Sequence, residues 1–287
     1  MTLNELYFFI KNLLQGSAQT DNPALLARRI TTLISGYSTT DIAAHPDAIV
    51  NNATREDVEQ IINRVKNNEP LEYIFNNASF LDLELYTNSS VLVPRPETEE
   101  LAMMISNNLN NQSNKKILDI GTGSGCIPIY LALHNTDNQY FACDISDNAI
   151  ATAKQNAQKY NLNNIEIFSA DIFNYQSNSI LNNAVFDIIV SNPPYVADSE
   201  KALMQPNVLD YEPHTALFVP DNDPLIYYKK ISEYAAAHLS PAGKLYFEIN
   251  ERFGKETAET MQQFGFKDVS IHQDLFGKDR MAEGTKA

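Results

Sequence analysis

The sequence predicts an α/β protein in which a mostly parallel sheet follows a small helical bundle and a β-hairpin. After residue 115, short apolar runs alternate with segments of helix length, which is typical of parallel strands joined by crossover helices. Apolar side chains recur at helical spacing over the first 75 residues, and the stretch that follows alternates between apolar and polar side chains, as strands do. We therefore expect a helical domain over residues 1–75, a hairpin linker over 76–94 and an α/β domain over 95–287.

The predicted helical domain contains at least three amphipathic segments. Leu3, Leu6 and Ile10 mark the first of them. The second follows Asp21-Asn22-Pro23, which reads as a helix cap and a first-turn proline. The third begins at Thr54-Arg55-Glu56-Asp57, whose first and last residues resemble a capping box. These helices could recognise a partner, or they could only pack against the rest of the chain.

The predicted linker lies between Leu71 and Val93. Phe80, Leu83 and Leu85 alternate there with acidic side chains, a pattern that indicates strands with one buried face. The polar run Asn88-Ser89-Ser90 is expected near the turn of the hairpin.

The α/β domain is predicted from five apolar runs and from the helical segments between them. Strands are expected at Lys116–Ile120, Gln139–Asp144, Ile165–Ala170, Phe186–Ser191 and Lys244–Ile249. Helices are expected at Cys126–His134, Asp147–Tyr160, Pro224–Leu239 and Arg252–Phe264. The tail, Phe266–His272 followed by Arg280–Thr285, could close the sheet as an antiparallel pair. Asparagine-rich stretches at 107–114 and 161–164 are expected to be surface loops.

The overall composition favours a soluble protein that acts on another protein or on a small molecule. The 287 residues carry a net charge of -15, and binding to bare nucleic acid requires clustered cations, so a direct nucleic-acid partner is disfavoured. Cys126 and Cys143 lack the spacing of a zinc site or a disulfide framework, and we expect no metal. The amino terminus lacks a signal-peptide pattern, and no apolar run approaches the ~18 residues of a membrane span. We expect a cytoplasmic monomer with no membrane partner.

A glycine-rich turn follows the first strand of the predicted sheet, at Gly121-Thr122-Gly123-Ser124-Gly125. Glycine permits positive φ angles and a close approach of the backbone to a ligand, and the following helix presents free N–H groups. Asp144 ends the next strand, about 20 residues further on, where a carboxylate can accept both ribose hydroxyls of a nucleoside. Loop and acid together predict a cofactor that contains adenosine.

The residues around this loop favour S-adenosylmethionine over a dinucleotide. The spacing is Gly-x-Gly-x-Gly rather than Gly-x-Gly-x-x-Gly. Asp119, just before the loop, would face a pyrophosphate with a negative charge but would suit an amino group. Asp171 could receive the adenine amino group, with Ile172 or Phe173 beside the ring. The alternative for Asp171 is a helix cap.

The tetrapeptide Asn192-Pro193-Pro194-Tyr195 follows the predicted strand Phe186–Ser191, and ligand crevices of α/β sheets lie at such strand ends. The Asn192 side-chain oxygen and the Pro193 carbonyl can each accept one N–H of an incoming amide or amine. The prolines stiffen the backbone, and Tyr195 offers a face for a planar group. If the nitrogen lies beside an electrophilic methyl group, no strong base is needed. Correct placement of the two reacting groups alone can lower the activation barrier by roughly 7–11 kcal/mol. The alternative is a proline turn without a ligand.

Over essentially its whole length the sequence resembles the HemK/PrmC protein methyltransferases, which methylate the side-chain amide of the glutamine in the Gly-Gly-Gln motif of peptide chain release factors. The matching segments are Glu69–Ile74, Pro94-Arg95-Pro96-Glu97-Thr98-Glu99, Asn192–Tyr195, Tyr211-Glu212-Pro213, Ala216-Leu217-Phe218 and Asp274–Arg280. The resemblance implies a Rossmann-like, class I S-adenosylmethionine-dependent methyltransferase fold with an antiparallel last strand.

The resemblance also implies a role for each matched position. The residues that would hold S-adenosylmethionine, which leaves as S-adenosylhomocysteine, are Gly121, Thr122, Gly123, Ser124, Gly125, Asp144, Asp171, Ile172 and Asn192. Those that would bind the substrate glutamine are Asn192, Pro193, Pro194 and Tyr195, with Asn192, Pro193 and Tyr195 catalytic. Arg95 to Thr98 would border the pocket, unless Arg95 and Glu97 form only a structural ion pair.

Two segments depart from the family's pattern. Val219-Pro220-Asp221-Asn222-Asp223-Pro224 stands where a glycine pair and an Asp-Gly are usual, and Asn250 stands where the family has a glycine after Glu-Ile. Both are expected to lie outside the methyl-transfer site.

Three other functions are alternatives. One is glutamine methylation of a ribosomal protein, against which the intact Pro94–Glu99 run argues by its resemblance. Another is adenine-N6 methylation of DNA, which shares the Asn-Pro-Pro-Tyr sequence but requires base flipping and a basic recognition region that the acidic balance disfavours. The last is a cofactor-binding scaffold that recruits partners through residues 1–75, against which the intact tetrapeptide argues.

Overall fold

The computed structural model describes residues 1–16 and 22–287. The chain divides into two compact units. The first comprises Met1–Asn76 and Gln205–Tyr211, and the second comprises Asn77–Met204 and Glu212–Ala287. None of the described helices is long and apolar enough to cross a bilayer.

The first unit is helical and is built around one apolar core. Its helices are α1 (Leu3–Leu14), α2 (Pro23–Ser35), α3 (Thr39–Ala44), α4 (Arg55–Lys66), the short α5 (Leu71–Ile74) and α10 (Pro206–Tyr211). Leu6, Ile30 and Val58, from three of these helices, are fully buried. The apolar spacing that predicts the long helices is confirmed. The alternation predicted to start at Leu71 is wrong for that residue, because it begins a helix.

The predicted helix starts of this unit are confirmed. Thr54 caps α4 in a reciprocal box, since its backbone N–H donates to Asp57 Oδ2 at 2.8 Å and the Asp57 N–H donates to Thr54 Oγ1 at 3.2 Å. Asn22 caps α2 by accepting from the backbone N–H of Leu25 at 3.0 Å. Asp21 lies outside the described residues.

The second unit begins with the predicted hairpin, which is shorter than expected. Strands β1 (Ala78–Phe80) and β2 (Leu83–Leu85) pair antiparallel, with Phe80 opposite Leu83. The turn is therefore at Leu81 and Asp82, and the expectation of a turn near Asn88-Ser89-Ser90 is wrong. The polar residues of that run form a separate local turn instead, in which Asn88 Oδ1 accepts from the backbone N–H of Ser90 at 2.8 Å.

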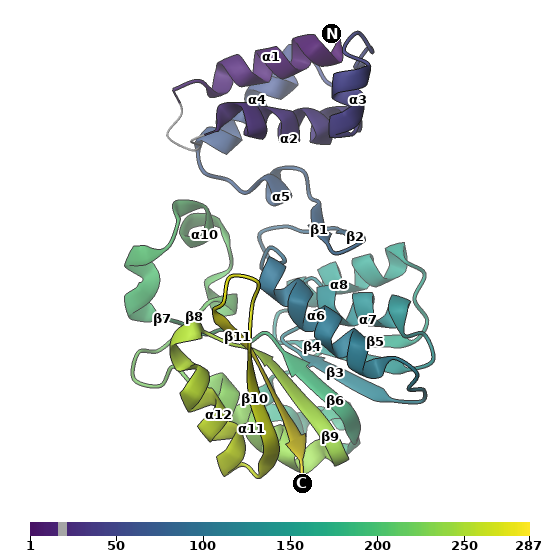
Figure 1. Cartoon of the computed structure of the whole chain (residues 1–287), viewed down its shortest axis with the longest axis vertical. Coiled ribbons are helices and arrows are strands. Elements are labelled where there is room, and N and C mark those ends of the chain that lie inside the picture. Colours follow the sequence, from purple (N-terminus) through teal and green to yellow (C-terminus); the bar gives the residue numbers. More distant parts are fainter. Residues whose placement is uncertain (17–21) are drawn as a thin grey trace. The chain divides into compact units, whose positions relative to one another are not determined.

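A seven-stranded sheet forms the centre of the second unit (Figure 1). Its strands are β3 (Lys116–Ile120), β4 (Gln139–Asp144), β5 (Ile165–Ser169), β6 (Phe186–Ser191), β9 (Leu239–Glu248), β10 (Phe266–Gln273) and β11 (Asp279–Lys286), in the order β10-β11-β9-β6-β3-β4-β5. β11 runs antiparallel to both of its neighbours, and the other pairings are parallel. The predicted strands and the antiparallel closing pair are confirmed.

Helices cover both faces of this sheet, which makes three layers (Figure 1). The helices are α6 (Pro96–Leu109), α7 (Cys126–His134), α8 (Asp147–Lys159), α9 (Ser179–Asn183), α11 (Ile226–His238) and α12 (Gly254–Gln263). α6, α7 and α8 pack on the face that carries Ile117, whereas α11 and α12 pack on the face that carries Leu118. The two cores follow from the strand period of two, which sends successive side chains to opposite faces.

Two further differences from the expected elements concern loops. α6 extends to Leu109, so the surface loop expected over 107–114 begins later than predicted, while 161–164 contains no helix or strand. The segment after β6 forms a small parallel pair, β7 (Val196–Ala197) with β8 (Phe218–Val219). That pair extends into the first residue of the atypical Val219–Pro224 segment.

Candidate active site

A cavity opens at the carboxyl ends of the parallel strands of the second unit, where the loops after β3, β4, β5 and β6 converge. It encloses about 1150 Å³ including its open mouth. Another part of the wall comes from the segment before α6 and from the start of that helix, and a further part comes from the segment before β8. The residues that line these parts are Ser90, Val91, Leu92, Pro94, Arg95, Thr98, Pro213, Thr215 and Ala216. This is the position at which open α/β sheets bind their ligands.

The glycine-rich loop forms one wall of the cavity. Gly121, Thr122, Gly123 and Ser124 line it, whereas Gly125 does not. The loop is held against β4 because the N–H groups of Gly121 and Thr122 both donate to the Cys143 carbonyl, at 2.9 and 3.0 Å. The three glycines have φ angles of 76°, 54° and 80°, in the left-handed region that other residues seldom adopt.

Gly125 lies at the end of the loop, where α7 begins, and lies close to α8. It is the N-cap of α7, and a Cβ built on it would lie 2.9 Å from Ile129 Cδ1 and 3.2 Å from Ala153 Cβ. The absent side chain therefore allows α7 and α8 to pack closely beside the loop.

We expect Gly125→Ala to be more destabilising than Gly265→Ala. Gly265 also has a positive φ, 88°, but a Cβ there would meet no atom within 4 Å. Both variants incur backbone strain of about 1–2 kcal/mol, and only Gly125→Ala adds the overpacking cost of about 1–3 kcal/mol. Urea denaturation measures the difference in the free energy of unfolding. Equal losses would show that helix packing does not require glycine at 125.

Asp144 lies at the end of β4 and lines the cavity. Its Oδ2 accepts from the backbone N–H of Gly123 and its Oδ1 from that of Ser146, each at 2.9 Å. Burial raises the pKa of Asp144 above its ordinary value, although the two N–H donors oppose this shift. The carboxylate is thus fixed in orientation before any ligand is bound.

Asp119 also lines the cavity and is 1% exposed. Burial, reinforced by the nearby Asp144 carboxylate, raises the pKa of Asp119 to about 7. Asp119 Oδ1 and the Thr122 hydroxyl are both buried, and among the described residues neither makes a hydrogen bond of normal geometry; a weaker interaction of Thr122 with the Asp119 carboxylate opposes the rise of its pKa. Buried polar atoms without a partner are rare, and at a cavity wall they mark a place where a ligand can donate. The site therefore fits a ligand that carries an ammonium group.

Asp171 and Ile172 line the wall after β5, as does Phe173. The alternative reading of Asp171 is observed, since its Oδ1 accepts from the N–H of Phe173 at 2.8 Å and caps a short 3₁₀ helix. Phe173 packs edge-on against Tyr227 of α11, with ring centroids 5.2 Å apart. Tyr227 also lines the cavity, but no sequence motif marks it, because it lies within the helix that follows the atypical loop.

The tetrapeptide after β6 divides between the cavity and the core. Asn192, Pro193 and Pro194 line the cavity, whereas Tyr195 is not among the described residues that do. The Tyr195 hydroxyl donates to Oε1 of Glu248, at the end of β9, at 3.0 Å, and its ring packs against the apolar core. The Tyr195 ring therefore packs on the core and its hydroxyl binds Glu248, whereas its role as a stacking face for the substrate stays a prediction.

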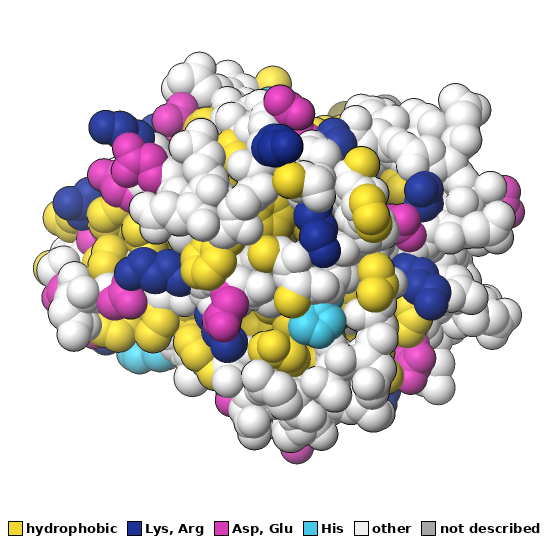
Figure 2. Space-filling view, turned by 90° about the horizontal axis from the view of Figure 1, so that it is seen from below, with side chains coloured by type: hydrophobic (Ala, Val, Ile, Leu, Met, Phe, Trp, Pro, Cys, Tyr) yellow, Lys and Arg dark blue, Asp and Glu magenta, His cyan; other side chains and the backbone are white. Residues whose placement is uncertain are grey.

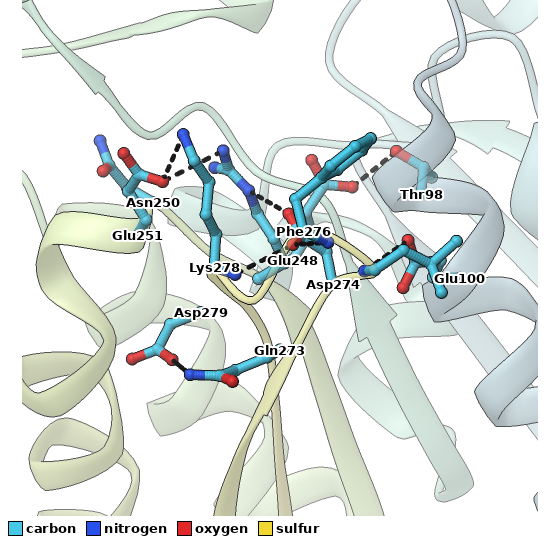
Figure 3. A network of polar contacts seen from close by, with 12 residues as sticks. Thr98, Glu100, Glu248, Asn250, Glu251, Gln273, Asp274, Phe276, Lys278 and Asp279 are labelled. Carbon is cyan, nitrogen blue, oxygen red and sulfur yellow. Dashed lines mark hydrogen bonds and ion pairs between the residues drawn. The ribbon is translucent and has the colours of Figure 1, made fainter.

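The start of α6 contributes two residues to the site. Thr98 is 3% exposed and accepts from Asn192 Nδ2 at 3.1 Å, and Figure 3 shows it pointing toward Glu248. Arg95 forms a 2.6 Å ion pair with Glu212, which is almost fully buried. The expectation of a structural ion pair between Arg95 and Glu97 names the wrong partner. Pro96 and Glu97 are not among the described lining residues, although Arg95 and Thr98 are.

Asn250 and Glu248 contact Tyr195 of the tetrapeptide, and neither is among the described residues that line the cavity. Asn250 Nδ2 donates to the Tyr195 carbonyl at 3.1 Å and to Glu200 Oε2 at 3.2 Å. Neighbouring contacts are drawn in Figure 3. Asn250 stands where the resemblance leads us to expect a glycine. Its side chain therefore forms two hydrogen bonds, to Tyr195 and to Glu200, that a glycine could not form.

The Rossmann-like sheet, the glycine-rich loop beside two acids and the Asn-Pro-Pro-Tyr corner define a class I S-adenosylmethionine-dependent methyltransferase. The family described as Methyltransferase small domain matches residues 98–209, and the PrmC N-terminal domain matches residues 9–75. A solved methyltransferase from Pyrococcus furiosus has the same fold, with a TM-score of 0.51, 18% identity and coverage of 78% of this chain and 97% of its own.

Sequence relatives define the family more narrowly. The chain is 46% identical to a release factor glutamine methyltransferase of Flavobacterium psychrophilum over 84% of each chain. It is 39% identical to one of Bacteroides thetaiotaomicron over 97% of this chain and 98% of the relative. The chain belongs to the release factor glutamine methyltransferase family.

Proposed function

We propose that this protein transfers a methyl group from S-adenosylmethionine to the side-chain amide nitrogen of the glutamine in the Gly-Gly-Gln motif of a peptide chain release factor. The observation that carries the proposal is the position of Asn192, Pro193 and Pro194 in the same cavity as the glycine-rich loop. Family membership supports the choice of substrate, because relatives over most of the chain carry that activity in their names.

The cavity residues suit the cofactor at both of its polar ends. Asp119 and the Thr122 hydroxyl would interact with the amino-acid part, and the Asp144 carboxylate, which is oriented by the Gly123 N–H, would accept the ribose hydroxyls. Ile172 and Phe173 would flank the adenine ring. A cofactor bound there would supply an electrophilic sulfonium methyl group: the S–CH₃ bond would break as the N–CH₃ bond forms, S-adenosylhomocysteine would leave, and the methylated nitrogen would release one N–H proton to solvent.

The Asn192 corner would hold the substrate amide and orient its nitrogen. The Asn192 carboxamide oxygen and the Pro193 carbonyl each accept one N–H of the substrate NH₂, and two acceptors favour the pyramidal nitrogen that attack requires. Pro194 has no backbone N–H, so it offers no competing donor there. The main contribution of these residues is placement, for which well-oriented groups gain roughly 7–11 kcal/mol.

The enzyme is proposed to act on its protein substrate in the cytoplasm, as a monomer, without a metal and without binding nucleic acid directly. On the face shown in Figure 2, basic and acidic side chains are interspersed. That distribution, with the net charge of -15, gives a nucleic acid no continuous cationic track there.

The test is a labelling experiment with methyl-labelled cofactor and three acceptors: a release factor, ribosomal proteins and duplex DNA. We expect label in the release factor alone, and none when its motif glutamine is replaced by alanine. Label chiefly in ribosomal protein or in DNA would replace the proposal by the corresponding alternative. Cofactor binding without transfer to any acceptor would favour a scaffold.

A pH dependence of cofactor affinity follows from Asp119. Its raised pKa means that the carboxyl group is largely neutral at pH 6 and largely ionised at pH 7.5, and only the ionised form pairs with an ammonium group. We expect the affinity for S-adenosylhomocysteine to rise about eightfold between these values. In the absence of ligand, the stability of the fold changes with pH in the opposite direction. Asp119 has a higher pKa in the folded chain than in the unfolded one, so its contribution to the free energy of unfolding decreases as the pH rises from about 4 to 7.

Calorimetric titration of the wild type and of Asp119→Asn measures the effect. The variant is expected to bind more weakly at pH 7.5 and to lose most of the pH dependence. An equal dependence in both proteins would assign the titration to another group.

A further inference from the structure

A directed chain of hydrogen bonds lies behind Asn192. Asn192 Nδ2 donates to Thr98 Oγ1 at 3.1 Å, and the Thr98 hydroxyl donates to Glu248 Oε2 at 2.5 Å. The Tyr195 hydroxyl donates to the other carboxylate oxygen of Glu248 at 3.0 Å. Figure 3 shows Thr98 on α6 and Glu248 on β9 facing each other. Three elements that are distant in sequence therefore meet at one buried carboxylate.

The direction of this chain is determined by the carboxylate. An ionised glutamate can only accept, so Thr98 and Tyr195 must both donate to Glu248. Thr98 has a single hydroxyl hydrogen, and once it is given to Glu248 the oxygen can only accept from Asn192. The amide nitrogen of Asn192 must then face Thr98, which leaves its oxygen as the polar atom available to the cavity.

We propose that Glu248 and Thr98 are positioning residues that fix the orientation of the Asn192 carboxamide, so that its oxygen and not its NH₂ meets the substrate nitrogen. This inference rests on the proposed function. A carboxamide turned by 180° would present two donors to the donor NH₂ of the substrate. Without a fixed partner both orientations are open to the side chain, and the reversed one is unproductive.

The environment of Glu248 supports this role. Glu248 is 1% exposed, and burial raises its pKa while the hydroxyls of Thr98 and Tyr195 oppose the shift. Arg280, whose charge also favours the ionised form, is itself paired with Asp274 and Glu251. A carboxylate buried without a close ion pair is unfavourable for stability, and here both of its oxygens accept from residues that adjoin the reaction site.

Four variants test the proposal in the full-length protein, with a release factor as substrate. Glu248→Gln replaces one of the two acceptor oxygens by a donor NH₂, so that Thr98 and Tyr195 can no longer both donate to residue 248. Thr98→Val removes the hydroxyl that links Asn192 to residue 248. We expect each to lower kcat, by up to about 100-fold, while the Kd for S-adenosylhomocysteine stays within about threefold. Thr98→Ser keeps the hydroxyl and is expected to restore most of the rate. The double variant Thr98→Val/Glu248→Gln should have a kcat no lower than that of the slower single variant, because both substitutions break the same chain of hydrogen bonds.

Tyr228→Phe is the matched control for a purely structural role. The Tyr228 hydroxyl donates to the backbone carbonyl of Glu248 at 3.2 Å and is fully buried, but it is not one of the side-chain hydrogen bonds that link Asn192, Thr98 and the Glu248 carboxylate. It should lower the melting temperature without a comparable loss of kcat. An equal loss in Tyr228→Phe, or a kcat within twofold of wild type in both Glu248→Gln and Thr98→Val, would overturn the proposal.

The side-chain amide NMR signal of Asn192 provides a readout that needs no substrate. We expect one of its two NH₂ protons to shift on Thr98→Val and on Glu248→Gln, while Thr98→Ser leaves it near its wild-type position. An unchanged signal in both disruptive variants would also overturn the inference. Wild-type protein that fails to label the release factor would instead contradict the proposed function, and the NMR result would still decide whether the chain exists.

Discussion

Asn192→Ala is expected to lower kcat by about 100- to 1000-fold while leaving the Kd for S-adenosylhomocysteine nearly unchanged. The size follows from losing one preorganised polar group at a reacting centre. Asn192 lines the cavity and is held by Thr98 from behind, so its removal takes away an acceptor for the substrate without disturbing the glycine-rich loop. Single-turnover kinetics with a release factor, together with calorimetry of cofactor binding, measures the two quantities.

Asn182→Ala on α9 is the control for this variant. Asn182 is an exposed asparagine of the same domain, and its replacement should change neither quantity. A folded Asn192→Ala protein that has lost cofactor affinity would contradict the role assigned to Asn192. So would one that methylates at the wild-type rate.

Asp144→Ala is expected to weaken cofactor binding by about 100-fold. The loss corresponds to two charge-assisted hydrogen bonds to ribose hydroxyls at about 1.5 kcal/mol each. The substitution also frees the N–H groups of Gly123 and Ser146, which the carboxylate holds at 2.9 Å, so the loop itself should loosen. Titration calorimetry with S-adenosylhomocysteine measures the affinity, and thermal denaturation in the presence of the same ligand gives an independent estimate.

Asp137→Ala separates a specific contact from the loss of one negative charge. Asp137 is exposed just before β4, at the opposite end of the strand from Asp144. The control should bind the cofactor like the wild type. Equal affinity in wild type and Asp144→Ala would show that the ribose is bound elsewhere.

The sheet and its helices could be predicted from the sequence because their signals are local. The run Phe186–Ser191 is apolar enough to be read as a buried strand without knowing its neighbours, and Gly121–Gly125 announces a strand-to-helix turn by its glycines. The corner after β6 and the acid at the end of β4 then come together, because parallel strands bring their carboxyl ends to one edge.

The parts that could not be predicted depend on pairs that are far apart in sequence. Thr98 and Glu248 are 150 residues apart, and Arg95 and Glu212 are 117 apart, so nothing in the local pattern of either residue names its partner. The same is true of Tyr195: its aromatic ring predicts stacking on a ligand, but nothing in the local sequence predicts the hydrogen bond of its hydroxyl to the distant Glu248. The local pattern does not predict α6, because the apolar positions of this helix begin only after its proline- and acid-rich start.

The segment Gln205–Tyr211 has a consequence for dissecting the protein. It belongs to the helical unit although it lies within the sequence of the methyltransferase unit, and the Tyr211 hydroxyl donates to the Asn67 carbonyl at 2.8 Å. The next residue, Glu212, holds Arg95 at the cavity. A protease cut or a deletion at residue 76 would thus not release a self-sufficient catalytic fragment. It would leave α10 without the helices that it packs with, and it would weaken the support of the Arg95–Glu212 ion pair at the cavity.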